Sequence, residues 1–210
     1  MTRWYTEKKK EHFYKEAKRT GYRARSAFKL QQIQHRFHLI QKNSIVIDLG
    51  AAPGGWSQVV KELVGTQGIV IGVDLKTIRP LEGIVFLQGD ITKPETIEQI
   101  KDQIKDKKAD VVLSDMAPDI SGNYSIDQAR SAWLCNCALK VAIEILRPGG
   151  HFLCKIFEGE DTKSFIEKVK QKFMIVKTFS PQASRKSSSE IYIVAKSFKK
   201  LYKETNISFE

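Results

Sequence analysis

The sequence contains few cysteines, and their positions give no sign of a metal site. The chain of 210 residues has three, Cys135, Cys137 and Cys154, each in an apolar context. Cys135 and Cys137 are two residues apart on a predicted helix, so their side chains point to different faces. The histidines of the chain add no spacing that is typical of metal ligands. We therefore expect buried free thiols in an intracellular protein whose chemistry requires no metal.

The sequence also lacks a long hydrophobic run. No apolar stretch reaches the length of a membrane span, and the basic N-terminus lacks the apolar segment of a secretory signal. The hydrophobic content of 41% is ordinary for a globular protein, and 210 residues suffice for one domain with a substantial core. We expect a cytoplasmic monomer that is not bound to a membrane. For a eukaryotic source, the mitochondrion or the nucleolus is the alternative location.

Positive charge is what the sequence has in excess, and it is concentrated in two flanks. The formal net charge is +11, and residues 1–43 carry +9 while residues 177–203 carry +6. The middle of the chain, residues 44–176, carries −2. A near-neutral body with two basic flanks is typical of a protein that binds a polyanion.

Apolar, β-branched runs alternate with helical patterns along the chain. We predict buried strands at seven of these runs: 44–50, 68–74, 83–90, 109–115, 150–157, 173–179 and 190–196. We predict helices around and between them at 22–37, 56–64, 94–105, 124–146 and 160–172. The alternation predicts an α/β fold with a mostly parallel sheet and helices on both faces. Only a short polar connection joins the last two strands, so the terminal strand should be antiparallel.

Each of the first four predicted strands ends in or beside an aspartate. These residues are Asp48, Asp74, Asp90 and Asp115, and the fifth strand ends in a segment that contains Lys155. In open parallel sheets, ligands bind beyond the carboxyl ends of the strands. We therefore expect a ligand site that is rich in carboxylates.

The turn after the first strand, Gly50 to Gly55, allows close backbone approach but is poorly equipped for anions. Its spacing does not match the dinucleotide fingerprint, Pro53 removes a backbone donor, and no basic residue lies in the turn. The aspartates would repel phosphates and favour a cationic ligand that carries hydroxyls. S-adenosylmethionine fits this description. Asp74 should accept from its ribose hydroxyls, Asp90 from its adenine amine, and the turn should contact its methionine part.

Several motifs, in order, make the chain resemble the FtsJ/RrmJ-type RNA 2′-O-ribose methyltransferases over roughly residues 2–198. The motifs are "RARSAFKL", "DLGAAPGGWSQ", "DLKTIRP", "FLQGDIT", "LSDMAPDISG", "LRPGGHFLCKIFEGE" and "SSSEIYIVA". The resemblance implies a Rossmann-like methyltransferase fold, S-adenosylmethionine as donor with S-adenosylhomocysteine as product, and an RNA ribose hydroxyl as acceptor. It is strongest to the bacterial and mitochondrial branch that methylates a uridine of large-subunit ribosomal RNA, within the large subunit or a precursor.

The resemblance also implies the residues of the site. A catalytic tetrad falls on Lys29, Asp115, Lys155 and Glu190. The implied cofactor contacts are Gly50, Ala51, Pro53, Gly54, Trp56, Asp74, Asp90 and Asp115. Two rival functions remain: 2′-O-methylation of transfer RNA or of an mRNA cap, and a non-catalytic role in RNA binding or ribosome assembly. The intact tetrad argues against the second.

A ribose hydroxyl is a poor nucleophile and must lose its proton as it attacks the methyl group. Lys155, with apolar neighbours on both sides, is the predicted base or hydroxyl-orienting group. Asp115 would orient it, while Lys29 and Glu190 would position the ribose.

The basic flanks are predicted to contact RNA. Arg25 and Lys29 should share one face of the helix 22–37, whose apolar stripe would pack on the core. The predicted RNA contacts are Arg23, Arg25, Arg185 and Lys186. We divide the chain into a basic helical extension at 1–43 that contacts RNA and carries Lys29, a methyltransferase domain at 44–200, and a disordered tail at 201–210.

Overall fold

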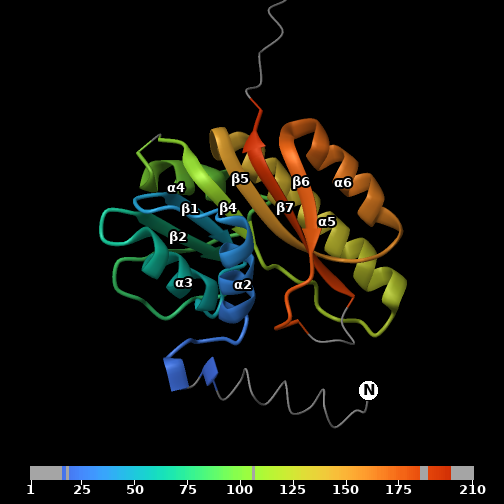
Figure 1. Ribbon diagram of the computed structural model, residues 1–210, viewed down its shortest axis with the longest axis horizontal. Coiled ribbons are helices and arrows are strands. Elements are labelled where there is room, and N and C mark those ends of the chain that lie inside the picture. The colour runs from blue at the N-terminus through green and yellow to red at the C-terminus, as the bar shows by residue number, and fades with distance from the viewer. Residues whose placement is uncertain (1–15, 18, 106, 185–188, 200–210) are drawn as a thin grey trace, which may run out of the picture.

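The computed structural model describes residues 16–17, 19–105, 107–184 and 189–199 (Figure 1). The predicted contacts Arg185 and Lys186 and the predicted tail at 201–210 lie outside the described residues, as do residues 1–15 of the predicted extension. The domain boundaries therefore stay a prediction.

Within the described residues, seven strands form one mixed sheet in the order β3-β2-β1-β4-β5-β7-β6. Their bounds are β1 Ile45–Leu49, β2 Ile69–Asp74, β3 Val85–Gln88, β4 Ala109–Ser114, β5 Leu146–Phe157, β6 Phe173–Phe179 and β7 Glu190–Phe198. The first five strands of the chain pair in parallel, and β7 pairs antiparallel with both β5 and β6. The terminal strand is therefore antiparallel, as predicted, and it lies inside the sheet rather than at its edge.

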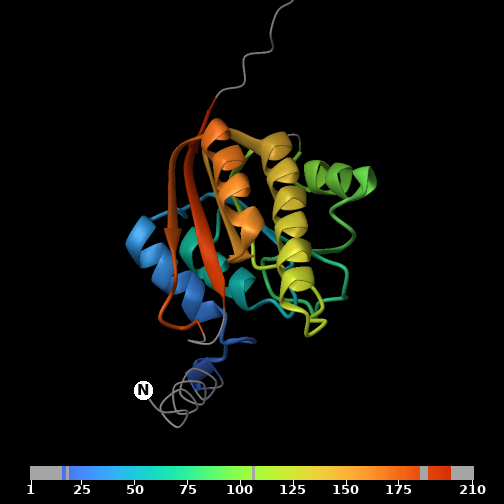
Figure 2. The same ribbon diagram turned by 90° about the vertical axis from the view of Figure 1, so that its right-hand side faces the viewer.

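Helices cover both faces of the sheet (Figure 2). The bounds are α2 Ala27–Phe37, α3 Gly55–Val64, α4 Pro94–Gln103, α5 Tyr124–Ile145 and α6 Glu160–Lys172. Helices α4, α5 and α6 bury their apolar side chains in one core cluster with the sheet, and α2 and α3 contribute to a second cluster on the opposite face. The α/β fold predicted from the alternation of patterns is confirmed.

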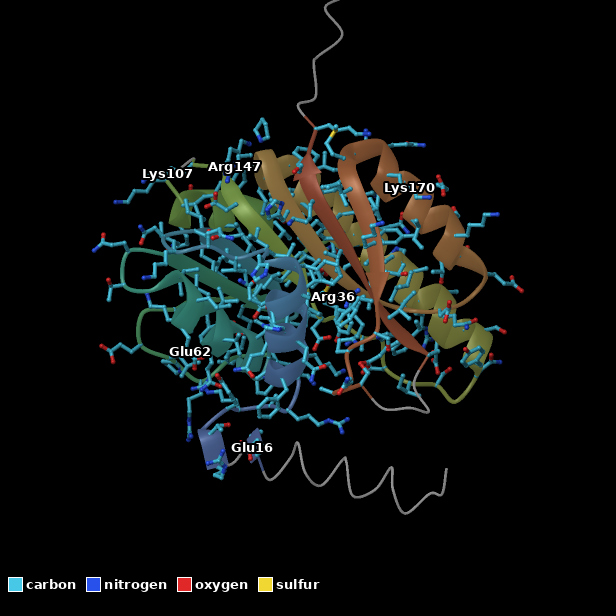
Figure 3. All side chains as sticks on the ribbon, viewed as in Figure 1. Glu16, Arg36, Glu62, Lys107, Arg147 and Lys170 are labelled. Atoms are coloured by element: carbon cyan, nitrogen blue, oxygen red, sulfur yellow. The ribbon has the colours of Figure 1, made fainter. Side chains whose placement is uncertain are left out.

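Helix α2 packs on the sheet as part of the same layer as α3. Leu30 and Ile33 are fully buried, and Phe37 packs against the same cluster, as the apolar stripe predicted. The guanidinium of Arg36 lies 5.5 Å from the ring centroid of Phe179 on β6 (Figure 3). The described part of the predicted extension therefore shares one core with the sheet.

Three local predictions were wrong. Strands β3 and β6 are largely exposed, with Val85 and Met174 open to solvent and only Phe173 of β6 buried, because these two strands form the edges of the sheet. Helix α2 begins at Ala27 rather than at residue 22, so Arg25 precedes the helix and does not share a helical face with Lys29. Strand β5 begins at Leu146 rather than at residue 150, directly after α5.

The three cysteines are free thiols, as predicted. Cys135 and Cys154 are buried, whereas Cys137 is half-buried. Among the helices of the described segments, none is long and apolar enough to cross a membrane.

Candidate active site

Four side chains that are distant in the sequence meet at the carboxyl edge of β4 and β5. Lys29 comes from α2, Asp115 follows β4, Lys155 lies near the end of β5, and Glu190 begins β7. The antiparallel register pairs Phe157 with Glu190, which brings the start of β7 to the end of β5. The fold therefore assembles the predicted tetrad in one place.

Each lysine of this group is held by a carboxylate from another element. The Lys155 ammonium donates to the backbone carbonyl of Asp115 at 2.6 Å and lies 3.0 Å from its carboxylate. The Lys29 ammonium forms an ion pair with Glu190, which also accepts from the Ser184 hydroxyl at 2.6 Å. Lys29 and Lys155 are each only 7% exposed. Pairing is what makes two ammonium groups tolerable at this depth.

The Glu190 carboxyl is ionised in this arrangement. Burial alone would raise its pKa, but the charge and hydrogen bond of Lys29, together with the Ser184 hydroxyl, hold the pKa of Glu190 below its usual range. The charge of Lys155 lowers it further, so both lysines act on this carboxylate. The four groups form one coupled electrostatic network.

Tyr192 is a member of this network that sequence reasoning missed. Its ring is fully buried, it pairs with Lys155 in the β5–β7 register, and its hydroxyl donates to the Asp115 carboxylate at 2.8 Å. Burial raises the pKa of Tyr192 well above its usual value, and the charges of Asp115 and Glu190 raise it further, so the phenol stays protonated. The spacing in the sequence could have predicted this role, because Tyr192 lies two residues after Glu190 and therefore on the same face of a strand.

The glycine turn after β1 lies close to the loop that follows β4. Gly50 has φ +75°, and a Cβ atom there would lie 2.4 Å from Cγ of Met116, next to Asp115. Gly54, with φ +107°, precedes α3 as its N-cap. The backbone NH of Ala52 donates to the Asp74 carboxylate at 2.9 Å, which fixes the turn, including Ala51 and Pro53, to the end of β2.

Asp48 is buried beneath this turn and has an unpaired oxygen. Its Oδ2 accepts from the Ser57 hydroxyl at 2.7 Å, and its Oδ1 has no partner among the described residues. Burial raises the pKa of Asp48 to about 7 against the effect of Ser57, and the charges of Asp115 and Asp74 raise it further. A cation at this edge of the sheet would relieve that repulsion.

Asp90 follows β3 and is half-buried. The backbone NH and the hydroxyl of Thr92 both donate to its Oδ1, and these bonds hold the pKa of Asp90 below its usual range. Asp74, Asp90 and Asp115 thus lie at one edge of the sheet, at or after the ends of β2, β3 and β4. A close-approach turn beside carboxylates and an unpaired buried oxygen fits a cofactor that carries hydroxyls, an amine and positive charge.

The side chains of two residues predicted to contact a ligand form hydrogen bonds within the protein instead. The indole of Trp56 is 2% exposed and donates to the carbonyl of Ser26 at 2.8 Å, with its ring 5.8 Å from that of Tyr192. The Arg23 guanidinium donates to the carbonyls of Pro53 and Pro80 at 3.2 and 2.9 Å. Arg23 therefore joins the segment before α2 to the glycine turn, and contact of either residue with a ligand stays a prediction. So does the contact of Arg25 with RNA.

In the segments that the structure describes, no three histidine, cysteine or acidic side chains gather in a way that could hold a metal ion. Metal-free catalysis remains a prediction.

Sequence comparisons identify relatives that span most of the chain. A family model described as FtsJ-like methyltransferase matches residues 22–198. The protein of Methanothrix thermoacetophila named ribosomal RNA large subunit methyltransferase E is 55% identical over 89% of this chain and 72% of its own length. The protein of the same name from Archaeoglobus fulgidus is 45% identical over 92% of this chain and 98% of its own length. These relatives are archaeal, whereas the resemblance predicted the bacterial and mitochondrial branch.

Solved structures share the fold. A crystal structure of a Plasmodium falciparum chain named as a ribosomal RNA methyltransferase is 32% identical, has a TM-score of 0.77, and aligns over 84% of this chain and 98% of its own. An S-adenosylmethionine-dependent O-methyltransferase from Thermotoga maritima is 13% identical with a TM-score of 0.55, over 82% of this chain and 66% of its own. The second likeness concerns the fold alone.

Proposed function

The chain belongs to the FtsJ-like methyltransferase family, and from this membership we propose that it methylates the ribose 2′-hydroxyl of a uridine in large-subunit ribosomal RNA. The observation that carries the proposal is the buried network of two lysines, two carboxylates and Tyr192 at the carboxyl edge of the sheet. Desolvation of the paired charges offsets most of their attraction, so the network adds little net stability, and a functional role is the better explanation for it.

The cofactor in this proposal is S-adenosylmethionine, which supplies an electrophilic methyl group on a sulfonium. The turn from Gly50 to Gly54 would lie against its methionine part, and Asp74 and Asp90 would accept from its ribose and adenine groups. The unpaired oxygen of Asp48 lies at the same edge of the sheet. These acceptor oxygens suit a ligand that is positively charged.

The chain's own residues then handle the ribose proton. Lys155 orients the hydroxyl toward the methyl group, or takes this proton as a neutral amine after its ammonium has released a proton to solvent. The carboxylate and carbonyl of Asp115 hold its ammonium nitrogen in place, and Tyr192 holds the carboxylate. Lys29, fixed by Glu190, would position the ribose from the opposite side. Preorganisation of this kind lowers the barrier by removing the need to orient the groups during the reaction.

The proposed substrate rests on the names of the relatives and on charge. The relatives are named as methyltransferases of the large ribosomal subunit, and a net charge of +11 suits a polyanion. Large ribosomal subunits are thus the proposed form of the substrate.

The test is methyl transfer from labelled S-adenosylmethionine to large ribosomal subunits, free large-subunit RNA and transfer RNA. We expect label in the large-subunit RNA, at a position where alkali fails to cleave because the 2′-oxygen is blocked. Lys155→Ala should lower kcat about 10²- to 10⁴-fold, the usual contribution of a general base. Label confined to transfer RNA would contradict the proposed substrate. A folded Lys155→Ala protein with the full rate would contradict the role of Lys155.

A further inference from the structure

The loop after β4 presents two large apolar side chains to solvent beside the catalytic network. Ile120 is 67% exposed and Tyr124, the first residue of α5, is 63% exposed. Ile120 lies five residues after Asp115. The two residues come from one short loop, and exposed apolar side chains next to a reactive site are typical of a binding surface, whereas single ones scattered elsewhere on a protein are ordinary.

This loop is held in a defined conformation. The buried carboxylate of Asp127 accepts from the backbone NH and the hydroxyl of Ser121 at 2.9 and 2.8 Å. The Asn123 side chain accepts from the NH of Ile126 and caps α5, and Gly122 takes φ +85°, a conformation that suits glycine. The two exposed side chains are thus presented by a fixed scaffold.

Hydrogen bonds connect Tyr124 to the strands that carry the tetrad. Its hydroxyl donates to the carbonyl of Glu158 at 3.4 Å, and the NH of Glu158 donates to the carbonyl of Ser189 at 2.8 Å. Ser189 precedes Glu190, and Glu158 lies three residues beyond Lys155, about 10 Å along the strand direction. Tyr124 therefore lies beside the reacting position rather than over it.

The charges around this loop indicate which part of a nucleic acid it would meet. Asp119, Glu158 and Glu160 are all exposed, and the guanidinium of Arg130 donates to the carbonyl of Asp119 at 3.5 Å. Three carboxylates against one guanidinium leave a net negative charge, which would repel a phosphate. A nucleobase is uncharged, and every base presents a face that stacks on an aromatic ring.

We propose that Tyr124 and Ile120 form a stacking platform for a base of the RNA strand that adjoins the methylated nucleotide. Bases can stack in this way only when they are unpaired, so the platform would select a single-stranded or opened segment. The inference rests on the proposed function, since it assigns a substrate contact to the same site.

The experiment compares three variants on large ribosomal subunits purified from cells that lack the gene. Tyr124→Ala should lower kcat/KM for the subunits about five- to a hundredfold, the range for loss of one base–aromatic stack. Tyr124→Phe keeps the ring and should stay within about twofold of the wild type. Trp133→Ala is the matched control: Trp133 is 57% exposed on the same helix, about 13 Å further along its axis, and its loss should change little.

Three further readouts separate a stacking contact from a loss of cofactor binding, of folding or of a phosphate contact. The affinity for S-adenosylmethionine and the melting temperature of Tyr124→Ala should equal those of the wild type. The salt dependence of KM should also keep its slope, because no phosphate contact is lost. Equal kcat/KM for Tyr124→Ala and wild type, or a reduced salt slope, would overturn the platform while leaving the proposed function intact. If the wild type itself fails to methylate the subunits, the proposed function fails instead.

Discussion

At the scale of single residues, the site depends on pairs that the chain assembles from distant positions. Lys29 and Glu190 are 161 residues apart, and Lys155 and Asp115 are 40 apart. Breaking a buried pair on one side leaves an uncompensated charge, which typically costs about 3–5 kcal/mol of stability. For each substitution in this network, the free energy of unfolding should therefore be measured together with the rate of methyl transfer.

Tyr192→Phe tests the residue that the sequence did not reveal. The change removes one hydroxyl that orients Asp115 and keeps the ring that packs against Trp56. We expect kcat to fall about tenfold, which corresponds to roughly 1.4 kcal/mol of positioning energy, with an unchanged KM for S-adenosylmethionine. Tyr22→Phe is the control, because the Tyr22 hydroxyl bonds to Glu62 and Gln31 outside the network. A rate for Tyr192→Phe equal to that of Tyr22→Phe would remove Tyr192 from the mechanism.

Asp48 gives a pH dependence whose sign follows from its raised pKa. The folded protein holds the Asp48 proton up to a pKa of about 7, whereas the unfolded chain loses it near 4, so this residue makes the protein less stable as the pH rises from 4 to 7. Asp48→Asn keeps an acceptor for Ser57 and does not titrate. The melting temperature of Asp48→Asn minus that of the wild type, both measured without cofactor, should therefore increase from pH 5 to pH 8. A constant difference between the two proteins would show that Asp48 has an ordinary pKa.

At the scale of elements, the apolar runs and glycine turns predict which segments form strands and helices, while their spatial order comes from pairing across the sheet. The strand ends at Asp74 and Asp115 were predictable because β-branched runs stop there. Two features were not predictable: the insertion of β7 between β5 and β6, and the exposure of the edge strands β3 and β6. An apolar run has the same sequence pattern whether its strand is central or at the edge. The network around Lys155 follows from that insertion and was predicted through resemblance alone.

Gly50→Ala tests the turn between β1 and α3. The new Cβ would approach Met116 and the backbone would be held at φ +75°, so we expect a loss of about 1–3 kcal/mol in stability and weaker binding of S-adenosylmethionine. Gly21→Ala is the matched control, because Gly21 has φ +78° but open space around it. If calorimetry and thermal melts find the two variants equal, the close approach at Gly50 has no role.

At the scale of the whole molecule, the two basic sequence flanks are partly built into the fold, because residues 1–43 contain α2 and residues 177–203 contain β7. The glycine turn, the aspartates and the tetrad gather at the carboxyl edge of the sheet, whereas Lys107 precedes β4 and Arg147 lies at the start of β5 (Figure 3). We expect RNA to contact the reactive edge and the basic flanks. The flanks themselves extend beyond the described residues, so their contacts with RNA stay predictions.

Methylation of a ribosomal uridine by this protein can be tested directly by a map of 2′-O-methylation on cellular RNA. The map compares cells that carry the wild-type gene, cells that lack it, and cells with Lys155→Ala protein at equal abundance. We expect one uridine of large-subunit ribosomal RNA that is methylated with the wild type and unmethylated in the other two. An unchanged map in cells that lack the gene, or full methylation with Lys155→Ala, would show that the protein does not act in this way.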